Sequence, residues 1–236
     1  MKTDAAQSWT SFWDTNHSVY VSPRHLDRHY QQIAADIIRV LPHAEARVLD
    51  YGCGEALHAS RIAAACGDLL LCDAAPNLRA RLTERFAGQH KIHVMSPADV
   101  DRLPESSVDL VVANSLVQYL RRDELADLLA TWRGALSAGG CVIVADVITP
   151  EQTALADASA LLRFAAANGF LVDAVSGLTR TLFSDYRKLR ARLGLTRYAP
   201  EDILSVMKQA GFSAEPLQPN FGYNDARLAV IGIKQP

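Results

Sequence analysis

The feature that most constrains the fold is an alternation, through the middle of the 236-residue chain, of short apolar runs and longer segments with helical spacing. Leu110-Val111-Val112-Ala113 and Val142-Ile143-Val144-Ala145 are continuous apolar strings. Such strings are typical of strands buried on both faces, and the usual setting of these strands is a parallel sheet covered by helices. We therefore expect strands at 47–51, 68–73, 91–95, 108–114 and 141–147.

The segments between these strands have helical periodicity. Leu78, Leu82 and Phe86 recur at four-residue spacing after the second strand, which places them on one face of a helix. Helices are expected at 58–66, 77–87 and 123–136. Repeated strand–helix–strand units give right-handed crossovers. The pattern therefore predicts an α/β fold with a Rossmann-like, doubly wound and mostly parallel sheet.

The C-terminal part has a different pattern, in which a helix at 200–210 is followed by two strands at 212–217 and 226–234. No helical segment separates these two strands, so they should pair as an antiparallel hairpin at the sheet edge and bring the sheet to seven strands. The expected organisation has four parts. These are an N-terminal helical cap segment (1–42), a core (43–147), a helical insertion that caps the substrate (148–198), and the helix and hairpin that complete the core (199–236).

The balance of basic and acidic residues restricts the kinds of partner that the chain is expected to bind. The chain has 24 Lys and Arg against 26 Asp and Glu, a formal net charge of -2. A nucleic-acid-binding protein usually carries a basic excess, so we expect no nucleic-acid partner. The N-terminus does not resemble a signal peptide, and no apolar run approaches the roughly 20 residues that span a bilayer. The 4 cysteines form no Cys-x-x-Cys pair, and we expect them to be reduced in a cytoplasmic protein.

The sharpest motif is the turn after the first strand, where residues 50–56 read Asp-Tyr-Gly-Cys-Gly-Glu-Ala. Glycines two apart allow a tight turn and the close approach of a ligand, and the next helix directs free N–H groups at that ligand. A dinucleotide site would need a third glycine at Leu57, so that pattern fails. An ordinary strand-to-helix turn is the alternative.

The turn resembles motif I of class I S-adenosylmethionine (SAM)-dependent methyltransferases, acidic-x-Gly-x-Gly-x-Gly, with Ala56 at the third glycine. The C-terminal antiparallel hairpin is the addition that distinguishes this family from a plain Rossmann sheet. The resemblance covers residues 47–146 and the last two strands, and it implies SAM as cofactor and S-adenosylhomocysteine as product. It assigns cofactor binding in this turn to Asp50, Gly52, Cys53 and Gly54.

Two further stretches carry the resemblance. Asp73 ends the second strand beside the glycine turn, where the family places the acid that binds the ribose hydroxyls, and Ala74 is assigned to the site with it. The alternative for Asp73 is an N-cap of the next helix. Asp99 and Val100, followed by Leu-Pro, resemble the family's adenine-binding pair. Asp101 is the competing acid, and a solvated loop carboxylate is the alternative.

The end of the fourth strand should lie beside the methyl group. The resemblance assigns Asn114 and Ser115 to cofactor binding, with Asn114 at the methionine end. Because Asn114 is not followed by Pro-Pro-aromatic, methylation of a nucleic-acid base is disfavoured. The substrate-binding residues are expected to be Tyr20, Gln118 and Tyr186.

The predicted function is in-line methyl transfer to a small-molecule acceptor. Its catalytic residues stay unassigned, because a base is needed only for some acceptors. Candidate bases are His17, His25, His29, His58 and Glu55, and no metal site is expected.

The alternatives to this function are a non-catalytic SAM-binding protein and, less favoured, a nicotinamide oxidoreductase. A basic amphipathic segment around Arg187 and Arg190 leaves a lipid-like or anionic acceptor, or contact with a membrane surface, as a further hypothesis.

Overall fold

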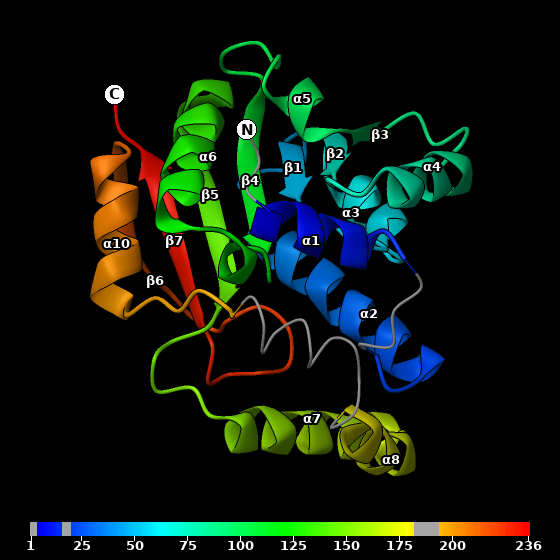
Figure 1. Ribbon diagram of the computed structural model, residues 1–236. Helices are drawn as coiled ribbons and strands as arrows, with labels where there is room; N and C mark the ends of the chain where they lie inside the picture. Colours follow the sequence, from blue (N-terminus) through cyan, green and yellow to red (C-terminus); the bar gives the residue numbers. More distant parts are fainter. Residues whose placement is uncertain (1–3, 16–19, 182–193) are drawn as a thin grey trace.

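The computed structural model describes residues 4–15, 20–181 and 194–236 (Figure 1). The described residues form a seven-stranded sheet with the order β3-β2-β1-β4-β5-β7-β6. The strands are β1 (Arg47–Tyr51), β2 (Asp68–Cys72), β3 (Ile92–Met95), β4 (Val108–Asn114), β5 (Leu136–Val147), β6 (Phe212–Leu217) and β7 (Leu228–Lys234). The helices are α1 (Asp4–Trp13), α2 (Pro23–Arg39), α3 (Ala59–Ala65), α4 (Pro76–Arg85), α5 (Pro97–Val100), η1 (Val117–Tyr119), α6 (Arg122–Ala135), α7 (Ala154–Asn168), α8 (Leu171–Thr181) and α10 (Pro200–Gln209).

The strand directions confirm the predicted doubly wound sheet. The neighbours β3, β2, β1, β4 and β5 are parallel, whereas β7 pairs antiparallel with both β5 and β6. The order reverses between β1 and β4, which lie side by side although two strands separate them in sequence. In open α/β sheets, ligands bind beyond the carboxyl ends of the strands at such a reversal.

Helices cover both faces of the sheet, as the continuous apolar strands require. One buried cluster joins α2, α3 and α4 to the sheet, with Ile37, Ile62 and Leu82 among its members. The other joins α6 and α10 to the opposite face through residues that include Leu129 and Met207. These two layers hold the carboxyl ends of β1 and β4 in fixed positions.

The helices α7 and α8 lie together beyond the carboxyl end of β5, separate from the two sheet layers (Figure 1). They share a small apolar cluster of their own, formed by Leu161, Ala165, Phe170 and Ala174. The division of the chain into a cap and a core stays a prediction. The basic segment around Arg187 lies outside the described residues. Among the described residues, the helices are all too short or too polar to cross a membrane.

The main boundary error concerns β5, which was expected to begin at Cys141 and instead begins at Leu136. The segment containing Gly139 and Gly140 belongs to the strand, and the pairing register with β4 shifts between Val108 and Leu110. The two glycines therefore accommodate an irregularity within the strand, where sequence alone indicated a turn before it.

Candidate functional site

The glycine turn between β1 and α3 has the backbone that its sequence predicts. Gly52 and Gly54 have φ values of +83° and +57°, in the region that favours glycine. The N–H of Gly52 donates to the Cys72 carbonyl oxygen over 2.7 Å, which ties the turn to β2. A Cβ built at Gly54 would lie 2.3 Å from the Tyr30 hydroxyl oxygen. Glycine is therefore required at this position by α2 as well as by the turn.

The third glycine position of the motif has a left-handed backbone too, although alanine occupies it. Ala56 has a φ of +43°, a value that non-glycine residues seldom adopt. Its methyl group is buried in the cluster beneath α2 and α3. The burial of this methyl group offsets part of the free-energy cost of the left-handed backbone. The turn therefore keeps the backbone conformation of the glycine motif at Ala56.

Asp73 lies against this turn and holds it. One carboxylate oxygen accepts from the Gly54 N–H over 3.1 Å, and the other accepts from the Ala75 N–H over 2.9 Å. Burial raises the pKa of Asp73, while these N–H donors and Arg79 oppose the increase. Each oxygen can accept a second hydrogen bond, so the carboxylate can still bind ligand hydroxyls.

Asp50 adds a second buried carboxyl group to the same corner of the cavity. Only 7% of the residue is exposed. Burial, and then the neighbouring charge of Asp73, raise the pKa of Asp50 to about 7. A positively charged ligand beside Asp50 would favour its ionised form.

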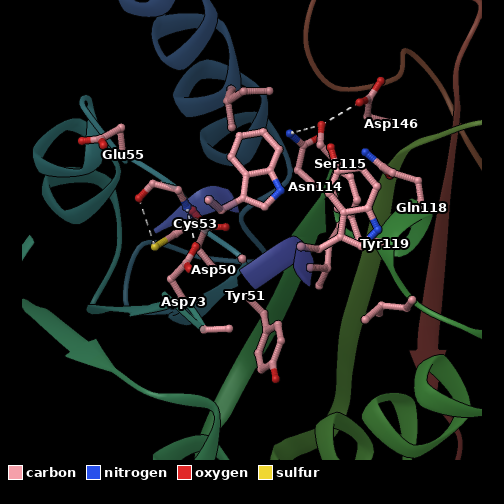
Figure 2. A pocket seen from close by; sticks show the side chains of 18 of the residues that line it. Asp50, Tyr51, Cys53, Glu55, Asp73, Asn114, Ser115, Gln118, Tyr119 and Asp146 are labelled. Atoms are coloured by element: carbon pink, nitrogen blue, oxygen red, sulfur yellow. Dashed lines mark hydrogen bonds between the residues drawn. The ribbon is translucent and has the colours of Figure 1, made fainter. Parts of the chain in front are cut away.

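A polar chain crosses from β4 to β5 on the other side of the reversal (Figure 2). The Ser115 hydroxyl donates to Asp146 over 2.6 Å, and the Asn114 amide nitrogen lies 3.3 Å from the Ser115 oxygen. Both Ser115 and Asp146 have positive φ, at +53° and +57°. The Asn114 side-chain oxygen is buried without a hydrogen-bond partner among the described residues.

These groups line one cavity of about 580 Å³. On one side lie Trp9 and Trp13 of α1, whose rings contact Tyr119 with centroids 4.7 and 5.7 Å apart. A second part of the lining is a set of aromatic rings from α2 and its neighbours, which we call the aromatic wall: Tyr20, His25, His29, Tyr30 and Tyr223. A cavity of this size and lining is typical of a small-molecule site.

The cavity brings together most of the residues that the sequence predicted for the site. Its lining includes, from those predictions, Asp50, Gly52, Cys53, Gly54, Asp73, Ala74, Asn114, Ser115, Tyr20 and Gln118. The substrate-binding assignment of Tyr186 lies outside the described residues. The binding roles themselves stay predictions.

Asp99 and Val100 do not line the cavity. Asp99 accepts hydrogen bonds from the Ser96 N–H and hydroxyl over 2.9 and 2.6 Å, and it pairs with Arg102. These contacts lower the pKa of Asp99 to about 2 and cap the short helix α5. Val100 is buried in the sheet core, and Pro97 is the residue of this helix that reaches the cavity.

Three of the candidate bases, His25, His29 and Glu55, line the cavity. Burial lowers the pKa of His25 to about 4, and burial together with His25 lowers the pKa of His29 to about 3, so both imidazoles are neutral at pH 7. His58 is paired with Asp27 at 2.9 Å. Glu55 is held by two arginines of α4, and His17 lies outside the described residues.

Sequence reasoning missed several members of the site, among them Tyr30, Tyr223 and Arg227. The Tyr30 hydroxyl accepts from the Glu55 N–H over 2.8 Å and also hydrogen-bonds to Tyr20. Tyr223 and Arg227 come from the segment that joins β6 to β7. No local motif marks these residues, because their place in the site depends on how α2 and this segment pack.

Comparisons with known proteins agree with this geometry. Residues 48–140 match the family described as a methyltransferase domain. Phosphoethanolamine N-methyltransferase 1 of Haemonchus contortus, solved with phosphoethanolamine and S-adenosylhomocysteine, is 26% identical with a TM-score of 0.52, over 63% of this chain and 34% of that one. The structure named PigF with SAH has 19% identity and a TM-score of 0.59, over 97% of this chain and 59% of that one, and shows the shared fold.

A sequence relative comes from Salinispora arenicola. Its probable nonribosomal peptide synthetase CymA is 34% identical over 125 residues, which are 51% of this chain and 2% of that protein. The chain therefore spans a small part of this relative and about a third of the Haemonchus enzyme.

The fold and the glycine–carboxylate corner define the class: the chain contains a domain of the class I SAM-dependent methyltransferase type. Within that class, its match is to the methyltransferase domain family over residues 48–140. The residues present fit the cofactor of this class. Gly52 and Gly54 line the cavity with the positive φ values of the motif, and Asp73 keeps acceptor capacity for hydroxyl groups.

Proposed function

We propose that this protein transfers a methyl group from SAM to a small-molecule acceptor that binds in the same cavity. The observation that carries the proposal is the continuity of that cavity, which extends from Gly54 and Asp73 past Asn114 to the aromatic wall. Both reactants can then be held in line at the reversal between β1 and β4, which is most of what catalysis of this reaction requires.

The chain's own residues have separable tasks in this proposal. SAM supplies a methyl group already activated by attachment to a positively charged sulfur. Asp73 binds the ribose hydroxyls and Asn114 orients the methionine end, as the family resemblance assigns them. The aromatic rings that line the cavity exclude water, which would otherwise solvate the acceptor.

A small acceptor is supported by the volume of the cavity, about 580 Å³, and by its aromatic lining. The ligand of the Haemonchus enzyme, phosphoethanolamine, is also a small molecule. The hypothesis of a lipid-like or anionic acceptor was drawn from a basic segment that lies outside the described residues.

Calorimetric titration with SAM and S-adenosylhomocysteine tests the cofactor half of the proposal. We expect saturable binding of both, and a Kd at least about tenfold higher for Asp73→Asn, because each lost charge-assisted hydrogen bond contributes about 1.5–3 kcal/mol. Asp202→Asn is the control, since Asp202 pairs with Arg122 outside the cavity. Absence of binding to the wild-type protein would contradict the proposal.

Transfer of labelled methyl groups to a panel of small acceptors tests the other half. We expect the wild-type protein to transfer the methyl group, and we expect Asp73→Asn, which binds SAM more weakly, to do so more slowly. Tight cofactor binding without transfer to any acceptor would favour a non-catalytic SAM-binding protein.

A further inference from the structure

We propose that the methyl acceptor is an amine, and that its nitrogen is held by the Asp146 carboxylate at the carboxyl end of β5. This inference rests on the proposed function, because it names the chemistry of the acceptor in the same cavity. The observations that support it are the charges around Asp146, the orientation of Asn114 and the aromatic wall.

The first observation is the charge of this end of the cavity. Among the described residues that line the cavity, Arg227 is the one arginine or lysine, and its guanidinium is hydrogen-bonded to both oxygens of Asp157, at 2.9 and 3.0 Å. The same guanidinium lies 3.9 Å from Asp146. Two carboxylates thus share one cation, and the neighbouring His29 is neutral at pH 7. An anionic acceptor would meet a net negative charge, whereas an ammonium group would neutralise it.

The second observation is the orientation of Asn114. The Ser115 hydroxyl has a single hydrogen, which it donates to Asp146 over 2.6 Å. Asn114 must therefore present its amide nitrogen, not its oxygen, to Ser115 at 3.3 Å. Its side-chain oxygen is left as an unpartnered buried acceptor.

Gln118 of η1 has a second buried amide at the same cavity. The residue is 5% exposed and lines the cavity, and its side-chain oxygen is buried without a hydrogen-bond partner among the described residues. The cavity thus has an oriented acceptor at Asn114, next to the Ser115–Asp146 pair, and a second amide oxygen at Gln118. A carboxylate acceptor has no hydrogen to offer them and an alcohol has one, but an amine or ammonium has two or three.

The third observation is the aromatic wall. The rings of Tyr20 and His29 are 5.4 Å apart, and Tyr223 is stacked on Phe164 at 4.5 Å. Burial raises the pKa of Tyr20 to about 12, so its ring carries no charge at neutral pH. Aromatic faces attract ammonium groups through their quadrupole, most strongly where water is excluded.

The movement of charge during methyl transfer agrees with the placement of the amine nitrogen beside Asp146. An acceptor that binds as an ammonium first releases one proton to water, and the lone pair of the resulting neutral amine then forms the new C–N bond while the C–S bond breaks and leaves its electron pair on sulfur. The positive charge thus passes from sulfur to nitrogen, and the product ammonium lies next to Asp146. For a phenolate or carboxylate acceptor, Asp146 would instead raise the free energy of the reactive anion.

Three probes with one shared ring test the inference: 2-phenylethylamine, 2-phenylethanol and phenylacetate. Each is titrated at pH 7.5 into protein saturated with S-adenosylhomocysteine. We expect the amine to bind at least tenfold more tightly than the other two. Asp146→Asn should remove this preference and leave the Kd for S-adenosylhomocysteine within twofold. Asparagine tolerates a φ of +57°, so this variant should fold.

Asp202→Asn, a carboxylate removed outside the cavity, should keep the preference for the amine. Binding of S-adenosylhomocysteine without a preference for the amine, including no binding of the amine, would overturn the inference and leave the proposed function standing. Failure of S-adenosylhomocysteine itself to bind would overturn the proposed function, and the inference with it.

Discussion

At the residue scale, the buried carboxyl group of Asp50 should make the affinity for SAM depend on pH. The pKa of its buried carboxyl is raised to about 7, so near neutral pH the group is divided between its neutral and ionised forms. SAM carries a sulfonium and an ammonium group against one carboxylate, and its net positive charge favours ionised Asp50. Binding of SAM therefore requires Asp50 to lose a proton when the pH is below about 7.

The sign of the resulting pH dependence follows from this proton release. Between about pH 5 and 7 the Kd for SAM should fall by up to about tenfold per pH unit as the pH rises, and it should level off above the pKa. Asp50→Asn, which cannot titrate, should show a flat profile over the same range. Calorimetry at half-unit pH steps measures both, and parallel profiles for the two proteins would contradict the assignment.

At the element scale, α2 is attached to the glycine turn by the Tyr30 hydroxyl, which accepts from the Glu55 N–H over 2.8 Å. Tyr30→Phe should reduce the free energy of unfolding by about 0.5–1.5 kcal/mol and weaken SAM binding, because the turn loses its partner on α2. Denaturant unfolding and calorimetry measure these effects.

The matched control is Tyr198→Phe. The Tyr198 hydroxyl is buried and has no hydrogen-bond partner among the described residues, so its removal should leave stability unchanged or increase it. Equal losses of stability in the two variants would show that Tyr30 contributes through its ring packing alone.

Local sequence patterns predicted the elements whose signals are themselves local. The strands 47–51, 108–114 and 212–217 have the predicted bounds, because a continuous apolar run or a short run before a turn marks them directly. The glycine turn and Asp73 were predicted for the same reason. Tyr30 and Tyr223 could not be predicted, since each reaches the cavity only through packing between elements far apart in the sequence.

Asp99 illustrates a different limit of the sequence. Its spacing before Leu-Pro matches the family pattern, but the same carboxylate satisfies the N–H and hydroxyl of Ser96. The motif cannot distinguish these two uses of one side chain, because Asp99 lies both at the spacing before Leu-Pro and three residues after the N-cap Ser96, the position of a capping-box acid.

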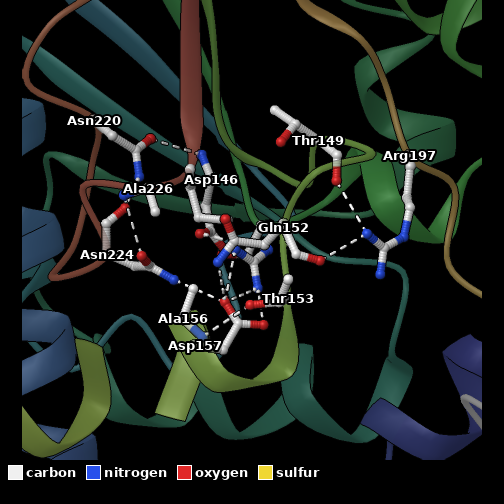
Figure 3. Close-up of polar contacts among 12 residues, drawn as sticks. Asp146, Thr149, Gln152, Thr153, Ala156, Asp157, Arg197, Asn220, Asn224 and Ala226 are labelled. Atoms are coloured by element: carbon white, nitrogen blue, oxygen red, sulfur yellow. Dashed lines mark hydrogen bonds and ion pairs between the residues drawn. The ribbon is translucent and has the colours of Figure 1, made fainter. Parts of the chain in front are cut away.

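At the scale of the whole molecule, Asp157 of α7 connects the helical insertion to the core (Figure 3). Its carboxylate accepts from Asn224 over 2.9 Å and from Arg227 over 2.9 and 3.0 Å. Asn220, in the same segment between β6 and β7, accepts from the Asp146 N–H over 3.0 Å. The insertion and the acceptor end of the cavity are therefore held by one polar network.

This network predicts that Asp157→Ala loosens α7 and α8 without changing the cofactor corner. The free energy of unfolding should fall by roughly 1–3 kcal/mol. This loss is smaller than for a fully buried ion pair, because 26% of the Asp157 side chain is exposed. Proteolytic cleavage within residues 154–181 should accelerate and acceptor binding should weaken, while the Kd for SAM stays within twofold.

Asp173→Ala is the matched control, because Asp173 is an exposed acid of α8 with no described side-chain partner. It should leave cleavage and binding unchanged. If both variants were cleaved at the wild-type rate, the network would not hold α7 and α8 in place. If Asp157→Ala weakened SAM binding as strongly as acceptor binding, the two ends of the cavity would not be separable, and Asp157 would stabilise the whole site rather than its acceptor end.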